Sequence, residues 1–150
     1  MATYSAMDIA KFIVNDCTCL SRPISNLKLQ KLLYFIWVDY YKRKKTMLFK
    51  DEMCAWQLGP VVPDVYFEFC SYGGQPIYEN YTTNLTENDQ VIVREILHSH
   101  VRNSTRSLVD MTHRKGSPWD RIFRNGAGNR QVIPFDLIKS IDCTEADNAF

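Results

Sequence analysis

The amino-acid sequence predicts a mainly α fold, a single compact helical domain with room for one short β-strand pair. Its 150 residues suit one domain that buries a core without metals or disulfides. Apolar residues recur at three-and-four spacing in several segments, and two of these segments open at Ser or Thr with an acidic residue three positions later. We expect residues 1–150 to form one unit, with a core from about residue 5 to 141 and a loose tail over 142–150.

The first two helices are predicted by their N-terminal caps and their apolar stripes. Ser5 with Asp8 has the spacing of a capping box, and Pro23 interrupts the chain after the first helix. Ser25 then caps a longer helix. Its apolar positions extend over more than one side: Leu29, Leu32, Leu33, Ile36, Trp37, Tyr40 and Tyr41. Because a helix that is apolar on more than one side is usually buried, we expect this helix to occupy the core.

The second helix is predicted to end in a basic run, KRKK, at residues 42–45. Four cations at this position complement the negative end of the helix dipole, which explains the run without a ligand. A patch for nucleic acid or for an acidic partner is the alternative. A single basic turn is a weak electrostatic footprint, so we do not expect nucleic acid as a partner.

A brief strand is predicted at residues 53–58, where Met53, Ala55 and Gln57 alternate with Cys54, Trp56 and Leu58. Gly59 and Pro60 follow, and we interpret them as a rigid corner between the aromatic side chains of Trp56 and Tyr66. Pro63 suits the first turn of a further helix, because the amide that proline lacks has no partner there. Gly73 and Gly74 end that helix, with its inward face extending to Cys70.

The second half of the chain predicts three more helical segments and a short helix at the end. Thr86 with Asp89 opens one helix, and a break is expected over residues 103–107 before the pattern resumes at Leu108. Gly116 and Pro118 turn the chain into the next segment. Residues 125–131 read as a loop, and the last helix begins at residue 134.

Composition excludes several classes of protein. With 45% hydrophobic residues and a formal net charge of +1, the chain has no overall attraction to nucleic acid or to a membrane. Five cysteines without a CxxC pair favour neither a disulfide framework nor a zinc ribbon, and they suit a reducing cytoplasm. Since no run of about 18 apolar residues predicts a membrane span, we expect a cytoplasmic protein.

No residue pattern indicates catalysis or metal binding. His98 and His100, two positions apart on a helix, point in nearly opposite directions and make a poor metal pair, while Cys17 and Cys19 have no companion ligands. His113 could serve as a general base or hydrogen-bond a neighbouring turn, but no nucleophile or paired carboxylate is identifiable beside it. We interpret it as structural and expect no catalytic residue, metal or cofactor.

Three stretches in this order, SNLKLQKLLYF, AWQLGPVVPDVYFEF and THRKGSPW, resemble the Panacea-domain family of SocA-like and GepA-like proteins. The resemblance spans about residues 5–141. Leu58 stands where the family often has an aromatic residue, a departure that bears on partner choice rather than on the fold. The positions that carry the resemblance, in a structural or partner-binding role, are Lys28, Leu29, Lys31, Leu32, Trp56, Gly59, Pro60, Val61, Tyr66, Thr112, His113, Pro118 and Trp119.

The resemblance implies a helical, non-enzymatic protein of bacteria, prophages or mobile elements, acting as the antitoxin of a toxin–antitoxin pair. It implies neutralisation of a cognate protein toxin by direct binding, with a homodimer left open. One alternative is a proteolytic adaptor that delivers the toxin to a AAA+ protease. Another is a nucleic-acid-binding regulator using residues 42–45 with Arg102, Arg106 and Arg114. An enzyme centred on His113 ranks last among the alternatives. No toxin-contact residue carries over from the resemblance.

Overall fold

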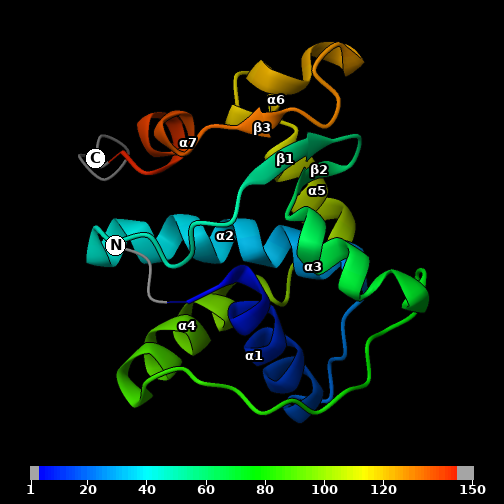
Figure 1. Cartoon of the computed structure of the whole chain (residues 1–150), viewed down its shortest axis with the longest axis vertical. Coiled ribbons are helices and arrows are strands. Elements are labelled where there is room, and N and C mark those ends of the chain that lie inside the picture. The colour runs from blue at the N-terminus through cyan, green and yellow to red at the C-terminus, as the bar shows by residue number, and fades with distance from the viewer. Residues whose placement is uncertain (1–3, 145–150) are drawn as a thin grey trace.

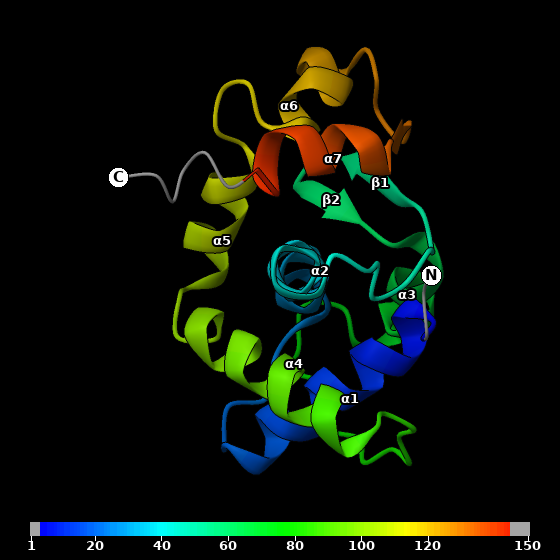
Figure 2. The ribbon, with the colours of Figure 1, turned by 90° about the vertical axis from the view of Figure 1, so that its left-hand side faces the viewer.

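Helix α2 (Asn26–Lys44) runs through the centre of the molecule in the computed structural model, which describes residues 4–144. Viewed along its axis, α2 is surrounded by the other elements (Figure 2). This arrangement confirms the mainly α fold and the central second helix. The other described helices are α1 (Ala6–Cys19), α3 (Pro63–Glu68), α4 (Glu87–His100), α5 (Thr105–Thr112), α6 (Pro118–Phe123) and α7 (Phe135–Asp142), with short 3-10 turns η1 (Cys70–Tyr72) and η2 (Arg124–Gly126).

Helices α1 and α4 cover one side of α2, and the small sheet lies on the other side with α5, α6 and α7 (Figure 1). Leu29, Leu33 and Ile36 are fully buried, as the apolar pattern predicted. Trp37 is also buried, and its indole Nε1 donates to the backbone oxygen of Phe49 at 3.0 Å. The core therefore lies around α2.

The predicted caps are confirmed. Ser5 and Asp8 form a capping box at the start of α1, and Ser25 Oγ accepts the amide of Lys28 at the start of α2. Thr86 caps α4 by accepting the amide of Asp89. The expected break follows α4 but is shorter than residues 103–107, because Ser104 caps α5 and the helix resumes at Thr105. These helix starts depend on residues within one turn of each other, which is why the sequence alone located them.

The sheet has three antiparallel strands rather than a single pair. They are β1 (Met53–Trp56), β2 (Gly59–Val61) and β3 (Val132–Ile133), in the order β2-β1-β3. Gly59 and Pro60, interpreted from sequence as a corner, belong to β2, and the turn lies at residues 57–58. Strand β3 lies between the expected loop and the last helix and was not predicted, because two residues are too few to show alternation.

Proline fits in β2 because of the way β1 shares its hydrogen bonds. Ala55 is the residue opposite Pro60, and both of its backbone polar groups face the β3 side. Its N–H donates to the carbonyl of Gln131, and its C=O accepts the N–H of Arg130. Strand β2 is an edge of the sheet, so the missing proline N–H removes no rung of the ladder.

Two element ends differ from expectation. Pro63 is at the first turn of α3 as predicted, but α3 ends at Glu68, and Cys70, expected to face inward, is exposed. The loose tail does not begin at residue 142, because Asp142 ends α7 and accepts a hydrogen bond from the Tyr34 hydroxyl, and Cys143 is buried. Residues 145–150 of the expected tail lie outside the described residues.

Candidate functional site

The residues that carry the family resemblance come from three separate stretches of the chain, and six of them meet where the β1–β2 hairpin packs on α2. We call this meeting point the hairpin junction and define it by Lys31, Gly59, Pro60, Thr112, His113 and Trp119. Lys28, Leu29, Leu32 and Pro118 lie outside it. Leu29 and Leu32 are buried in the core, Lys28 Nζ donates to the Val101 carbonyl at 2.7 Å, and Pro118 occupies the first turn of α6.

Two buried amide side chains on α2 hold the segment that follows β2. Gln30 Oε1 accepts the backbone N–H of Val62 at 3.0 Å, and Asn26 Nδ2 donates to the backbone oxygen of Tyr66 at 3.0 Å. Gln30 Nε2 also donates to Asn26 Oδ1 at 3.0 Å, so the two side chains support each other. Since buried polar groups are costly unless they are hydrogen-bonded, these contacts fix the position of α3 on α2.

Lys31 holds the strand itself. Its side chain is fully buried, and Nζ donates to the carbonyl oxygen of Pro60 at 2.5 Å. Burial away from water disfavours the charged ammonium and lowers the pKa of Lys31 to about 7. Lys31 is therefore a positioning residue for the hairpin, and its charge is sensitive to pH near neutrality.

Gly59 makes this close packing feasible. Its backbone has a φ of +116°, a conformation that side chains disfavour. A Cβ at this position would lie 2.8 Å from Lys31 Nζ and 2.7 Å from Thr112 Oγ1. Glycine is thus required here twice, once by the backbone conformation and once by the space that α2 and α5 leave.

His113 and Trp119 join the α5–α6 segment to the hairpin. Their rings stack at a centroid distance of 3.8 Å and an interplanar angle of 7°, and Trp119 Nε1 donates to the backbone oxygen of Trp56 at 2.7 Å. Burial, with a further contribution from Lys31, lowers the pKa of His113. Within residues 4–144, His113 Nε2 is buried without a hydrogen-bond partner, so no nucleophile is hydrogen-bonded to it.

The outer side of the hairpin carries an apolar groove of about 170 Å³. We call it the hairpin groove; its lining residues are Leu27, Gln30, Trp56, Gln57, Leu58, Val61 and Tyr66. The rings of Trp56 and Tyr66 meet edge-on at a centroid distance of 4.9 Å. Leu58 is 50% exposed beside them, and Phe67, 57% exposed, lies 6.1 Å from Trp56 between ring centroids.

Arg130 covers one face of the groove's tryptophan. Its guanidinium carbon lies 4.6 Å from the centroid of the Trp56 ring, a cation–π contact. Neither Arg130 nor Phe67 was identified from the sequence, because their nearness to Trp56 exists only in the folded chain. Gln30 was overlooked too, although a glutamine inside an otherwise apolar helical stripe was a usable signal.

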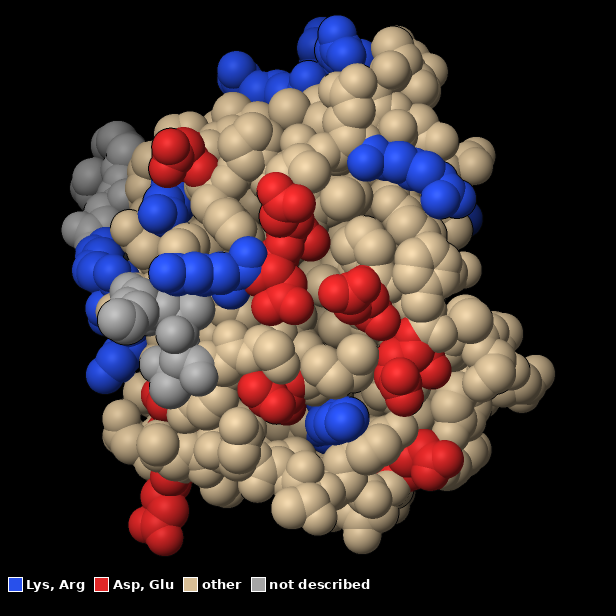
Figure 3. Space-filling model, in the orientation of Figure 1, with Lys and Arg blue, Asp and Glu red and all other residues tan. Residues whose placement is uncertain are grey.

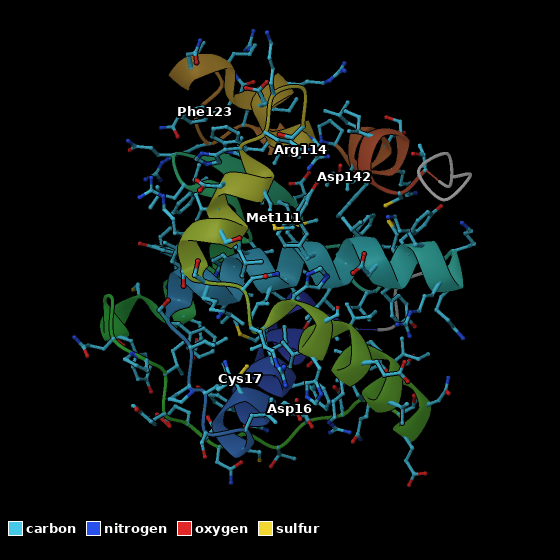
Figure 4. All side chains as sticks on the ribbon, turned by 180° about the vertical axis from the view of Figure 1, so that it is seen from behind. Asp16, Cys17, Met111, Arg114, Phe123 and Asp142 are labelled. Atoms are coloured by element: carbon cyan, nitrogen blue, oxygen red, sulfur yellow. The ribbon has the colours of Figure 1, made fainter. Side chains whose placement is uncertain are left out.

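The basic residues considered for nucleic-acid binding do not form one stripe. Residues 42–45 lie at the C-terminal end of α2, whereas Lys28 contacts Val101 near the beginning of the same helix, beside Arg102. Arg106 pairs with Asp110, and Arg114 pairs with Asp142 of α7, which it approaches in Figure 4. Lys42 and Arg114 do line one depression, but Asp39 and Asp142 line it with them. These carboxylates offset the positive charge that a nucleic-acid surface needs.

His98 and His100 contact different partners, Asp16 at 3.0 Å and Asp39 at 2.6 Å. In the described part of the chain no group of three or more potential ligands is placed to hold a metal ion. No helix among residues 4–144 has the length and hydrophobicity needed to cross a membrane.

Comparison with known proteins adds two matches. The family model described as "Antitoxin SocA-like, Panacea domain" matches residues 29–120, from α2 to α6, a range that contains the whole hairpin junction. The curated protein "Antitoxin SocA" of Caulobacter vibrioides (strain NA1000 / CB15N) is 33% identical over 136 residues, covering 82% of this chain and 72% of that protein. No solved structure matches the chain.

Proposed function

Because the chain belongs to the SocA-like Panacea-domain family of antitoxins, we propose that it neutralises a cognate protein toxin by binding it directly through the hairpin groove. Family membership supports the antitoxin role. The binding mode and the contact surface are the proposal, and they rest on the groove described above.

The exposed apolar side chains beside the groove are the observation that carries this proposal. Leu58 and Phe67 are each at least half exposed, next to the partly buried rings of Trp56 and Tyr66. Tryptophan, tyrosine and arginine dominate the binding energy of protein interfaces, and Arg130 adds the third of these residue types. Adjacent exposed apolar groups of this kind mark interaction sites.

The hairpin junction gives the groove the rigidity that binding favours. Lys31 and Gln30 hold the backbone at Pro60 and Val62 through buried hydrogen bonds. A surface that is already ordered loses little conformational freedom on association, so more of the contact energy appears as affinity. The residues of the family resemblance are accordingly proposed to build the binding surface from beneath, with few of them contacting the toxin.

The test is co-expression of this protein with each gene adjacent to its own, scoring growth and then co-purification. We expect one neighbour to be toxic alone, harmless together with this protein, and recovered bound to it. The double variant Leu58→Ser, Phe67→Ser should lose both protection and co-purification. The control Tyr78→Ser, Val91→Ser removes two exposed apolar side chains elsewhere and should retain both.

Toxin abundance in the same cells distinguishes neutralisation from delivery to a protease. Under direct neutralisation the toxin accumulates in the complex. A toxin level that falls when this protein is present, and recovers when a AAA+ protease is deleted, would replace direct neutralisation with the adaptor mechanism. No toxic neighbour, or protection that survives the groove variant, would contradict the proposal.

A further inference from the structure

An acidic depression of about 230 Å³ lies beside the hairpin groove. Its lining residues are Asp51, Glu52, Cys54, Val62, Pro63 and Asp64. Acidic side chains gather in the middle of the face that carries β1 and α3 (Figure 3). The depression has an apolar floor and an acidic rim.

The depression and the groove are neighbours on the hairpin. Cys54 of the depression is paired across the hairpin with Val61 of the groove. Val62, the next residue, lines the depression again. Directly opposed residues of antiparallel strands lie about 5 Å apart, so one short segment of a bound protein spans both.

Within the described part of the chain, no ion pair is formed at the acidic rim. Among residues 4–144, Glu52 and Asp64 make no ion pair or side-chain hydrogen bond, whereas Asp51 accepts the backbone N–H of Ala6 at 2.9 Å. Several other carboxylates are paired, among them Asp16 with Arg94 and Asp142 with Arg114. A basic side chain from a partner would supply the missing charge.

We propose that the toxin segment bound here places an apolar side chain in the hairpin groove and, one or two residues away, a lysine or arginine in the acidic depression. This inference rests on the proposed function and specifies the chemistry of the partner. The aliphatic stem of the basic side chain packs on Val62 and Pro63 while its charged end meets Glu52 and Asp64.

Arg130 fixes the direction of the bound segment. It lies over the ring of Trp56, which lines the groove, and it does not line the acidic depression. A basic residue placed there would be repelled by the guanidinium, so only the orientation that directs the basic residue toward Glu52 and Asp64 is favourable.

The test compares the affinity of purified toxin for three double variants at about 50 mM and about 300 mM NaCl. Glu52→Gln, Asp64→Asn should weaken binding at least about tenfold at low salt and flatten the salt dependence. The matched control Glu87→Gln, Asp136→Asn removes two exposed charges on α4 and α7 and should bind as the original chain does. Circular dichroism verifies that each variant is folded.

The groove variant Leu58→Ser, Phe67→Ser distinguishes a failure of the basic-residue inference from a failure of the proposed function. If it loses binding while Glu52→Gln, Asp64→Asn binds normally at both salt concentrations, the basic-residue inference is wrong and the proposed function stands. If neither variant affects toxin binding, the proposed contact surface fails as well. A second test measures which of a set of overlapping toxin peptides this protein captures. The captured peptides should share an apolar residue within two positions of Lys or Arg. Capture of peptides without a basic residue would overturn the inference.

Discussion

The two sides of α2 are held by different kinds of contact. On the side of α1 and α4, apolar side chains such as Ile13, Val93 and Leu97 are fully buried against the helix. On the side of the hairpin, α2 contributes Gln30 and Lys31, whose buried polar atoms bond to the backbone of the facing segment. Hydrogen bonds also join α2 to the α4 side, from Lys28 to Val101 and between His100 and Asp39, but they are only partly buried. Those of Gln30 and Lys31 are fully buried, so the hairpin side depends more strongly on individual atoms.

This difference fits a division of roles. Apolar packing, which is not directional, forms the core of the protein, while the directional buried hydrogen bonds fix the position of one hairpin. We propose that the accuracy serves toxin binding, since a displacement at Pro60 or Val62 would move the groove that Trp56 and Tyr66 form. The variants below compare the two sides, from the largest expected effect to the smallest.

Gly59→Ala should destabilise the protein most. The added Cβ would lie within 3 Å of Lys31 Nζ and of Thr112 Oγ1 in a backbone conformation that alanine disfavours, so we expect a loss of about 3–5 kcal/mol in the free energy of unfolding. Urea denaturation measures it. Gly74→Ala is the control, because a Cβ there meets no atom within 4 Å. Equal stabilities of the two variants would contradict the close packing described at Gly59.

Gln30→Ala should cost about 2 kcal/mol, because it leaves the buried Val62 amide without its acceptor. Hydrogen exchange of that amide is the sharper measurement, since its protection should fall more than that of amides in α4. Uniform loss of protection across the chain would indicate instead that the two sides of α2 respond alike.

Lys31 should make stability depend on pH near neutrality. Its folded pKa of about 7 lies below its ordinary value of 10.5, so the unfolded chain binds more protons between these values. The free energy of unfolding should therefore rise with pH from about 7, by about 1 kcal/mol per pH unit at most. Lys31→Met should remove this rise, as equilibrium unfolding at several pH values would show.

The useful window for this comparison ends near pH 8.5. Burial raises the pKa of Cys17 to about 12 and that of Cys143 to about 11, so above the ordinary thiol pKa of 9.0 both groups act in the opposite direction. An original chain and a Lys31→Met variant with the same pH dependence between 7 and 8.5 would show that Lys31 keeps an ordinary pKa.

Ser25→Ala should have the smallest effect, a loss of about 1 kcal/mol, because it removes one capping hydrogen bond at the start of α2. Thermal unfolding measures it. The control Ser140→Ala lies on the exposed side of α7 and should change stability less. A loss as large as that of Gly59→Ala would mean that helix caps matter as much as the hairpin junction.

The same two sides explain what the sequence could predict. Caps and stripes act within a few residues, so the local patterns at Ser5, Ser25 and Thr86 were enough to locate three helices. The hairpin depends on atoms that the chain brings together from residues 30, 60 and 112, and no local pattern encodes such a contact. Gly59 was therefore interpreted as a corner, although the structure places it in a strand.

The candidate surface was still harder to foresee. The family resemblance pointed to Trp56, Gly59 and Tyr66, but the exposure of Phe67 and the position of Arg130 over Trp56 follow only from the fold. The unpaired charges of Glu52 and Asp64 are likewise a property of surface position. Residue type alone does not distinguish a carboxylate with a partner from one without.

Hydrogen exchange of the protein, alone and bound to its toxin, tests the central claim most directly. The account predicts that amides over residues 56–67 exchange at least about tenfold more slowly in the complex, while those of α4 (Glu87–His100) keep their free rates. Slowed exchange in α4 with unchanged rates over residues 56–67 would place the toxin on the opposite side of α2 and contradict the role assigned to the hairpin groove.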